Sequence, residues 1–481
     1  MIKRLLPVLA LLVVALVSVS LVAAQNALPG SGWLSGQQIQ NLSETTNGTI
    51  VFTAYDQQGN DTSCGSKNAP PGGSVNYLTN SDCNVPAGFV GSAVVSADQP
   101  IAAIVNVVNS PTGRAGGMYR GTDGSDVATT IAFPLVKNNF NNRNTTLYVQ
   151  NAGGGANNIT VKFTIEGNDY TKAFTGVPAN AMVVVTGADA GAPAGKFGSA
   201  TATGSLALAG TALEHQINVP VGDNLQAYTA FTPNNFDDVA YCPLVRNGHT
   251  AANQTTGIQA QNVSLAAQQI EVVYSFQVGN GPIQTKTVTS GNIAPGASAN
   301  FFSADAAMGM PAGSLGSAKI TGKGGGNIAV IVNDAAYNVN PQRQTAYTCF
   351  PDNGKSNKVA LPLYKEYFNG NTAGIQIQNA GAAPATVTLT YTSTVGNKVV
   401  KFSHSTPIAA GGSTTFFGVS QKTFPASLTV VSGTPTDLVG TYGGVVITSN
   451  QPIVAIVNEA PGALTGAPST QDAKLYEGFN Q

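Results

Sequence analysis

The sequence predicts an all-β protein made of four tandem immunoglobulin-like β-sandwich modules of about 110 residues each, joined as an elongated array. The first observation is a hydrophobic-Gln-Asn triplet that recurs at a nearly fixed period across the 481 residues. The second is a set of short alternating stretches, bounded by Gly, Asn and Pro, in each repeat. A fixed period indicates one structural unit used repeatedly. The predicted division is a signal peptide at 1–24 and modules at 25–124, 125–236, 237–353 and 354–481.

Each repeat is framed by two Asn residues. The triplet Asn is Asn41, Asn151, Asn262 and Asn379, and a closing Asn follows about 70 residues later, at Asn106, Asn218, Asn333 and Asn458. Between them, three repeats carry Pro-Ala-Gly, at 86–88, 193–195 and 311–313, and then Gly-Ser-Ala, at 91–93, 198–200 and 316–318. The fourth repeat departs from this pattern, with Ser427 in place of the first Gly and Gly443-Gly444-Val445 after an insertion.

Strands are predicted throughout each repeat, and the second module illustrates them. Its candidates are residues 135–136, 147–149, 159–165, 170–174, 182–185, 200–208 and 213–219. Seven short strands in a module of this length are typical of an immunoglobulin-like sandwich. Three modules begin with a Pro-Leu strand start, at Pro134, Pro243 and Pro362, whereas the first has only Leu28-Pro29. We therefore expect the opening strand of the first module to be incomplete.

Composition narrows the function classes. Charged residues make up 9% of the chain and the formal net charge is -1, so no electrostatic attraction to nucleic acid or to an anionic membrane is expected. The hydrophobic content of 42% is enough for a folded core.

The N-terminus predicts export. A basic start at residues 1–4, an apolar run over 5–22 and small residues up to Ala24 are typical of a Sec-type signal peptide that leaves Gln25 as the mature start. The alternative is an uncleaved anchor, because the apolar run is almost long enough to span a bilayer. The expected location is extracellular or at the cell surface, with no membrane span once the signal is removed.

The repeats resemble the tandem Ig-like, CARDB-type β-sandwich modules of bacterial secreted and cell-surface proteins, over residues 25–481. No Cys-Trp-Cys core is present, since Trp33 precedes the first triplet, so an antibody-type domain is excluded. The resemblance implies a spacer, lattice or adhesive role outside the cell.

The four cysteines favour two structural disulfides within modules. Cys64 and Cys83 fall in the first module, and Cys242 and Cys349 in the third. Of the three possible pairings, the one within modules is favoured, and the other two stay open at this stage. Disulfides agree with an exported protein.

Catalytic chemistry is not predicted. His215, His249 and His404 do not occupy corresponding positions in their modules, and no nucleophile elbow, zinc-binding or phosphate-loop motif occurs. Residues 322–326, a Gly-rich stretch, are predicted to form a turn between strands. The sequence therefore predicts neither an enzyme nor a cofactor.

The predicted module junctions hold the only ligand candidates. Asp123, Asp126, Asp237 and Asp238 could contribute oxygen ligands to structural calcium. The alternative is that Asp, Asn and Gly simply form turns there. The third junction offers one carboxylate, from Asp352.

These observations favour a secreted or surface-displayed, non-enzymatic structural or adhesive protein that acts as a spacer, surface-layer or filament component. Its expected partners are further copies of itself, other surface components or glycans. The alternative is an extracellular carbohydrate- or ligand-binding protein.

Two further expectations concern the chain after each closing Asn. A Tyr recurs there, at Tyr119, Tyr228, Tyr347 and Tyr476. We expect this segment to turn back beside the opening strand of its own module, with the Cys242–Cys349 bond fixing the return in the third. The tail, residues 476–481, could also complete the first sandwich of another copy by strand addition, and the favoured alternative is an edge that its own chain completes.

Overall fold

The computed structural model describes residues 28–109, 115–216, 224–339, 342–421, 427–462, 464 and 473–480. The predicted signal peptide lies outside these ranges. The described chain consists almost entirely of antiparallel strands, with a single four-residue helix, α1 (Thr79–Asp82), and a few short 3₁₀ turns. The all-β prediction is therefore confirmed. The strands fall into four consecutive groups along the chain, whereas the predicted module boundaries themselves stay a prediction.

Group 1 has two sheets, which we call inner and outer. The inner sheet has the order β4-β1-β6-β7 and the outer sheet has the order β3-β2-β5. The strands are β1 (Trp33–Asn41), β2 (Gly48–Asp56), β3 (Asp61–Ala69), β4 (Ser74–Leu78), β5 (Gly91–Ala97), β6 (Ile101–Asn109) and β7 (Gly116–Arg120).

Group 2 contains seven strands, as predicted for this repeat, but one of them spans two predicted ones. They are β8 (Ala128–Asn138), β9 (Arg143–Asn151), β10 (Asn157–Ile165), β11 (Asn168–Val177), β12 (Met182–Thr186), β13 (Lys196–Gln216) and β14 (Leu225–Thr229). The 21-residue β13 pairs with β10 and β8 in its first half and with β9 and β14 in its second. It therefore runs from the outer into the inner layer.

Group 3 repeats this plan with β13 replaced by two strands. Its strands are β15 (Val239–Asn247), β16 (Gln254–Asn262), β17 (Ile270–Val278), β18 (Gln284–Thr289), β19 (Ser298–Phe302), β20 (Ser314–Gly322), β21 (Ile328–Ala336), β22 (Arg343–Thr348) and β23 (Phe350–Pro351). Residues 323–325 between β20 and β21 form the predicted Gly-rich turn.

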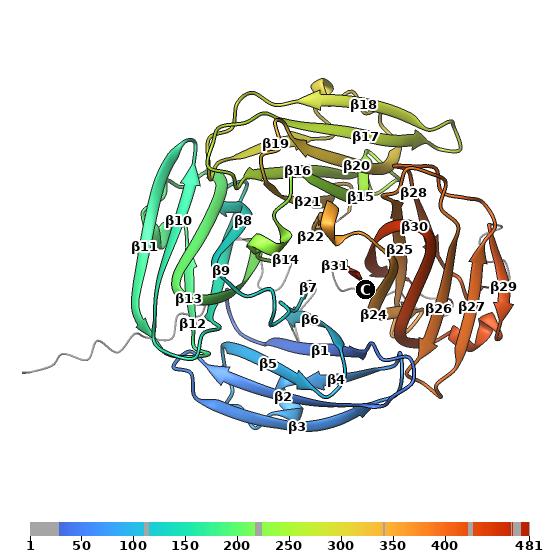
Figure 1. The fold of residues 1–481 in the computed structure, drawn as a ribbon, viewed down its shortest axis with the longest axis horizontal. Coiled ribbons are helices and arrows are strands. Elements are labelled where there is room, and N and C mark those ends of the chain that lie inside the picture. The colour runs from blue at the N-terminus through green and yellow to red at the C-terminus, as the bar shows by residue number, and fades with distance from the viewer. Residues whose placement is uncertain are drawn as a thin grey trace, which may run out of the picture.

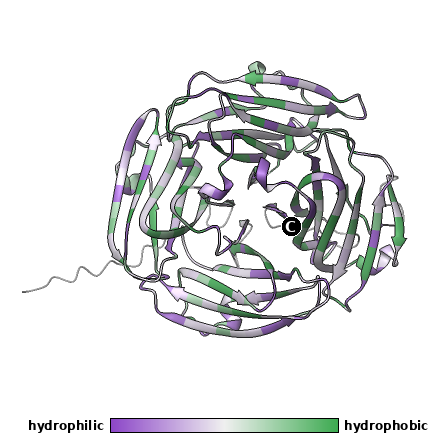
Figure 2. Cartoon of the chain, in the orientation of Figure 1, coloured by the Kyte–Doolittle hydropathy of each residue, from purple (hydrophilic) through white to green (hydrophobic). Residues whose placement is uncertain are grey.

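Group 4 again has a long shared strand. Its strands are β24 (Ser356–Glu366), β25 (Asn371–Asn379), β26 (Val387–Ser393), β27 (Val399–His404), β28 (Ser413–Phe417), β29 (Leu428–Ser432), β30 (Thr441–Pro461), β31 (Lys474–Glu477) and β32 (Phe479–Asn480). Each group is thus a two-layer, sandwich-like unit. Apolar residues alternate along the strands (Figure 2), and the buried ones form the cores between the layers.

The four groups close into a ring, so the predicted elongated array is wrong. The innermost strands β7, β14, β22 and β31 surround a common axis (Figure 1), and each contacts the next, including β31 and β7. The core clusters also cross the junctions: Ile331 of group 3 packs with group 2, Ile456 of group 4 with group 3, and Ile104 of group 1 with group 4. Repeats of equal length do not reveal the rotation between neighbours, and that rotation decides between a rod and a ring.

In groups 2, 3 and 4 the segment after the closing position turns back beside the opening strand as expected, whereas in the described part of group 1 strand β7 pairs with β6 alone. Strand β22 pairs with β21, and the following β23 pairs with β15, the opening strand of its own group. The Tyr347 hydroxyl donates to the Leu244 carbonyl at 2.6 Å and accepts from the Leu244 N–H. The Tyr476 hydroxyl makes the same two bonds with Leu363, and the Tyr228 hydroxyl donates to the Leu135 carbonyl.

The register of the paired strands corrects the position of one predicted closing Asn. Asn106, Asn333 and Asn458 face Gly36, Gly257 and Gly374. The residue at this position in group 2 is Leu213, which faces Thr146. Asn218, the predicted closing Asn, lies outside the described residues.

The chain's tail is not a free donor strand, contrary to the strand-addition hypothesis. Tyr476 is fully buried, and β32 pairs with β24 of its own group. The tail therefore completes group 4, because the same return that places β23 in group 3 uses these residues here. In the described ranges, no helix is both long and apolar enough to cross a bilayer.

Candidate functional site

The recurring glycine of Gly-Ser-Ala marks a close crossing of strands in every group. A Cβ at Gly316 would lie 2.0 Å from the Ser275 carbonyl oxygen, which is far inside van der Waals contact. The equivalent distances are 2.0, 2.2 and 2.0 Å at Gly91, Gly198 and Gly443. Any side chain here would push two neighbouring strands apart, and this explains why the glycine recurs.

In groups 1, 2 and 3 the serine after this glycine joins the group to the next. The Ser317 hydroxyl donates to the Gly411 carbonyl at 2.8 Å, from group 3 to group 4. Ser92 and Ser199 make the matching bonds to Asn180 and Gly296. The serine is therefore a junction residue.

In groups 3 and 4 the triplet Gln bonds in the opposite direction, whereas Gln40 and Gln150 bond carbonyls of their own groups. Gln378 of group 4 donates to the Ala318 carbonyl of group 3 at 3.2 Å, and Gln261 of group 3 donates to the Ala200 carbonyl of group 2 at 3.3 Å. The triplet Asn, in contrast, stays inside its group: Asn379 donates to the Ala383 and Ile408 carbonyls and accepts from the Gly381 N–H.

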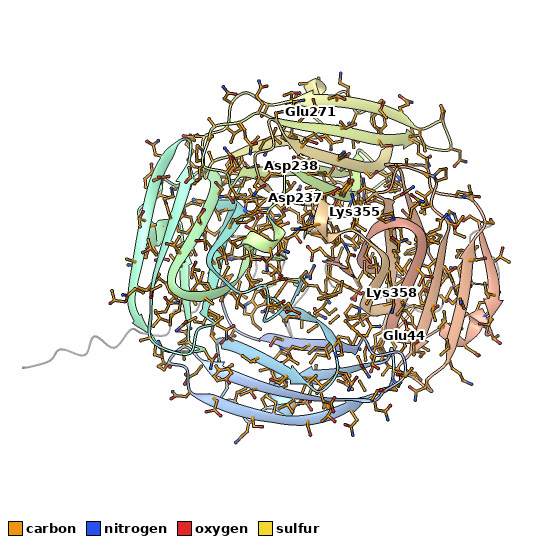
Figure 3. The ribbon with its side chains drawn as sticks, viewed as in Figure 1. Glu44, Asp237, Asp238, Glu271, Lys355 and Lys358 are labelled. Carbon is orange, nitrogen blue, oxygen red and sulfur yellow. A yellow bond between two sulfur atoms is a disulfide. The ribbon has the colours of Figure 1, made fainter. Side chains whose placement is uncertain are left out.

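The junction between groups 4 and 1 uses different contacts. Gly444 replaces the serine there, and the Gln40 amide nitrogen would lie 2.6 Å from a Cβ at that position. Ser74 donates to the Pro362 carbonyl at 3.0 Å, and the Lys358 ammonium pairs with Glu44 at 2.5 Å (Figure 3). This exposed pair contributes little to stability. Ile104 and Met118 of group 1 also pack into the group 4 core at this junction.

Three groups bury an ion pair near the axis, at matching positions. These pairs are Lys137–Glu214 at 2.8 Å, Arg246–Asp334 at 3.1 Å and Lys365–Glu459 at 2.8 Å. Burial raises the pKa of Asp334, although Arg246 opposes the shift. Burial also opposes ionisation of Glu459, but Lys365 and Lys474 together lower its pKa. The register position of these acids in group 1 is Val107, so group 1 lacks the pair.

A small cavity of about 40 Å³ lies where β7, β14 and β22 end, lined in part by Arg120, Asp123, Asp126, Thr229 and Thr348. At about 15 Å³ per water, it has room for two or three waters. The Arg120 guanidinium lies over the Phe479 ring, 4.5 Å from its centre. The cavity is too small for a sugar or a nucleotide.

The predicted calcium candidates lie in loops that bond one another. Asp123 accepts from the Ser125 N–H and hydroxyl at 2.8 and 2.6 Å, which is a turn contact. Asp126 accepts from Asn234 at 3.1 Å, and Asp237 accepts from the Asn353 N–H at 3.1 Å. Burial, together with Asp237, raises the pKa of Asp238.

The three junction loops are thereby tied together around one end of the axis. Asp237, Asp238 and Lys355 lie near one another in Figure 3. Asp352 accepts from the Tyr241 hydroxyl at 2.9 Å and pairs with Lys355. Across the residues that the structure describes, no three His, Cys, Asp or Glu side chains gather closely enough to hold a metal ion. Calcium at these loops stays a prediction.

Both predicted disulfides are present. Cys64 bonds Cys83, and Cys242 bonds Cys349, with Cα atoms 4.2 and 4.7 Å apart. The three histidines lie apart from one another in groups 2, 3 and 4. Burial lowers the pKa of each, although Glu214 opposes the shift at His215.

Group 1 has an open sheet edge. In groups 2, 3 and 4 the opening strands β8, β15 and β24 pair with the strand that carries the Gly-Ser-Ala position. In the described part of group 1 no such strand is present, and β5 pairs with β2 alone. The predicted incomplete opening strand thus corresponds to an outer sheet with three strands among the described residues of group 1.

Comparison with known proteins does not identify a family for this chain. Neither the protein-family models nor the curated proteins searched give a match to this chain. Among solved structures, Thermotoga maritima 1070 is 12% identical, covering 24% of this chain and 96% of its own, with a TM-score of 0.19. The major pilin from Streptococcus pyogenes, in a mutant form, is 9% identical, covering 73% and 98%, with a TM-score of 0.12. Both scores are too low to support an argument about function.

Proposed function

We propose that the protein is an exported, non-enzymatic structural protein that serves at the cell surface as a rigid, ring-shaped building block. One observation carries the proposal: the residues that recur in the sequence either hold the strands of a group together or join neighbouring groups. The glycine allows close strand crossing, the serine and Gln join neighbouring groups, and the Tyr fixes the return segment. What the repetition preserves is therefore architecture.

The two disulfides support the location, because such bonds persist in oxidising compartments outside the cytosol. The CARDB-type resemblance belongs to the same proposal, and the two-layer form of each group supports it. The expected spacer role assumed a rod. Because a ring of four such units is compact, the proposed role is instead that of one unit in a surface assembly.

The test is to express the full chain, with its N-terminus, in a host that exports through the Sec pathway. We expect the protein to resist reduction, to be cleaved by protease added to intact cells, and to appear as ring-shaped particles by negative-stain microscopy. Protein that stays in the cytosol with reduced cysteines would overturn the proposal.

A second candidate function, glycan binding, is favoured by exposed apolar side chains at matching register positions. Phe302 and Phe417 are 40% and 47% exposed, and they face Gly257 and Gly374 across the strand pair. An aromatic ring beside a bare backbone is a surface on which a sugar can stack. A glycan array probed with the wild type and with Phe302→Ala/Phe417→Ala separates the two functions, since only a glycan-binding protein gives signals that the variant loses.

A further inference from the structure

The open edge of β5 exposes residues that the other groups bury. Ala93, Val94, Ser96 and Ala97 are exposed, and Val95 is half-buried. The residues that match Ala93 are Ala200, Ala318 and Val445, and those that match Val95 are Ala202, Ile320 and Ile447; all six are at most 1% exposed. Group 1 therefore leaves both a row of backbone hydrogen-bonding groups and part of its core uncovered.

This edge also lacks the features that keep sheet edges from pairing. Proteins protect such edges with charged residues, especially Lys, with Pro or with bulges. Strand β5 reads Gly-Ser-Ala-Val-Val-Ser-Ala, with neither a charge nor a Pro, and its pairing with β2 is free of register shifts. The edge is thus competent to accept another strand.

The described ends of the chain do not supply that strand. The tail is used in group 4. At the other end, Leu28 packs with Val107, Leu213 and Leu225 at the junction of groups 1 and 2. If the signal is removed after Ala24, only residues 25–27 precede Leu28. Three residues span about 10 Å at most, whereas seven-residue β5 needs about 23 Å.

We propose that two copies of the chain pair through β5, antiparallel, about a two-fold axis at Val94. The sequence of β5 complements itself in this register. On the outer face Val94 meets Val94 of the second copy, and Ser92, whose hydroxyl donates to the Asn180 carbonyl of its own chain, lies opposite Ser96. On the core face Ala93 meets Val95. Apolar residues therefore meet apolar ones, and serines lie opposite serines, in an isologous contact.

The proposal extends the structural role proposed above by naming the partner, and its test is independent of cellular location. If no dimer forms, the pairing through β5 is wrong but the structural role at the cell surface is unaffected. If the protein proves to be cytosolic, the role at the cell surface is wrong but the pairing through β5 is unaffected. Because one strand pair buries less than a standard interface of about 1,600 Å², we expect an affinity in the micromolar range.

The first experiment is sedimentation equilibrium on the protein that begins at Gln25, up to about 100 μM. The wild type should dimerise. Val94→Lys should raise the dimer Kd at least about tenfold, because two like charges then meet across the two-fold axis. The matched control is Val51→Lys. Val51 is also 38% exposed, on the same face, but β2 is already paired on both sides, so its Kd should stay within about threefold.

The second experiment tests the register. All four native cysteines are in disulfides, so an introduced thiol has no native partner. Val94→Cys should cross-link two copies on mild oxidation, because residues directly opposite in a strand pair have Cβ atoms about 5 Å apart. Val51→Cys should not. A wild type that stays monomeric, a dimer that Val94→Lys leaves unchanged, or equal cross-linking of both variants would each overturn the proposal.

Discussion

At the residue scale, buried tyrosines show how one hydroxyl decides whether a side chain fixes the fold or only fills it. Tyr347 and Tyr274 are both fully buried in the group 3 core. The hydroxyl of Tyr347 bonds both backbone groups of Leu244, whereas that of Tyr274 has no partner among the described residues. Two residues of one type therefore have different energetic roles.

We expect Tyr347→Phe to lower the free energy of unfolding by about 1–3 kcal/mol, because it leaves the Leu244 N–H and carbonyl buried without their partner. Tyr274→Phe is the matched control and should change the free energy of unfolding by less than about 0.5 kcal/mol, or raise it. Urea denaturation of both variants measures the difference. Equal losses would mean that the Tyr347 hydrogen bonds do not matter.

A buried acid should make stability depend on pH. Burial raises the pKa of Glu366 to about 7 from a usual value of 4.5, although hydrogen bonds from Ser420 oppose the shift. The folded protein therefore holds one proton more than the unfolded chain between these pH values. The contribution of Glu366 to stability falls as the pH rises from 4.5 to 7, and the whole penalty is present above pH 7.

Glu366→Gln removes the charge and keeps an oxygen that can accept from Ser420. We expect this variant to be more stable than the wild type at pH 8, by roughly 1–3 kcal/mol, and about equal to it at pH 4. Thermal unfolding at both pH values provides the measurement. A variant that is less stable at pH 8 would contradict this assignment of the pKa.

At the element scale, the return segment after the closing position is the feature that the sequence predicted in most detail. The recurring Tyr and the position of Cys349 predicted that the chain turns back beside its opening strand, and β23 and β32 do so. Strand β14 was not predicted: all five of its residues are buried, but its sequence, Leu-Gln-Ala-Tyr-Thr, is not continuously apolar. The break predicted within β13 is absent because one continuous strand crosses from layer to layer.

The two disulfides close loops of very different length, with separations of 107 and 19 residues. On the chain-entropy argument, the long loop contributes about 4.7 kcal/mol and the short one about 3 kcal/mol. We expect Cys242→Ala/Cys349→Ala to lower Tm more than Cys64→Ala/Cys83→Ala does, as measured by calorimetry. The reverse order would show that the group 1 bond compensates for the missing strand there.

At the scale of the whole molecule, the sequence predicted the units but not their arrangement. The serine and Gln that join neighbouring groups are visible as repeats, yet their partners are backbone carbonyls, which any residue supplies. Because every residue has a backbone carbonyl, the sequence does not show which residue accepts such a bond. Neither the ring nor its junctions could therefore be predicted from the recurring residues. The open edge was partly foreseen, from the shortened Leu28-Pro29 start.

The ring should be evident in solution. A compact protein of residues 25–481 has a radius of gyration of about 23 Å, whereas four units in line would give roughly twice that value. Small-angle scattering at a concentration low enough to hold the protein monomeric should return the smaller value. A radius near that of the extended arrangement would contradict the closed ring.

The edge of β5, which no described strand of group 1 covers, fixes the number of copies that can join through it. A ring with four identical open edges could bind neighbours on every side and extend without limit. Here the chain itself covers the corresponding edge in groups 2, 3 and 4. The edge of β5 in group 1 becomes paired when two copies meet. Growth through this edge stops at a pair, so any larger array must use another face of the ring.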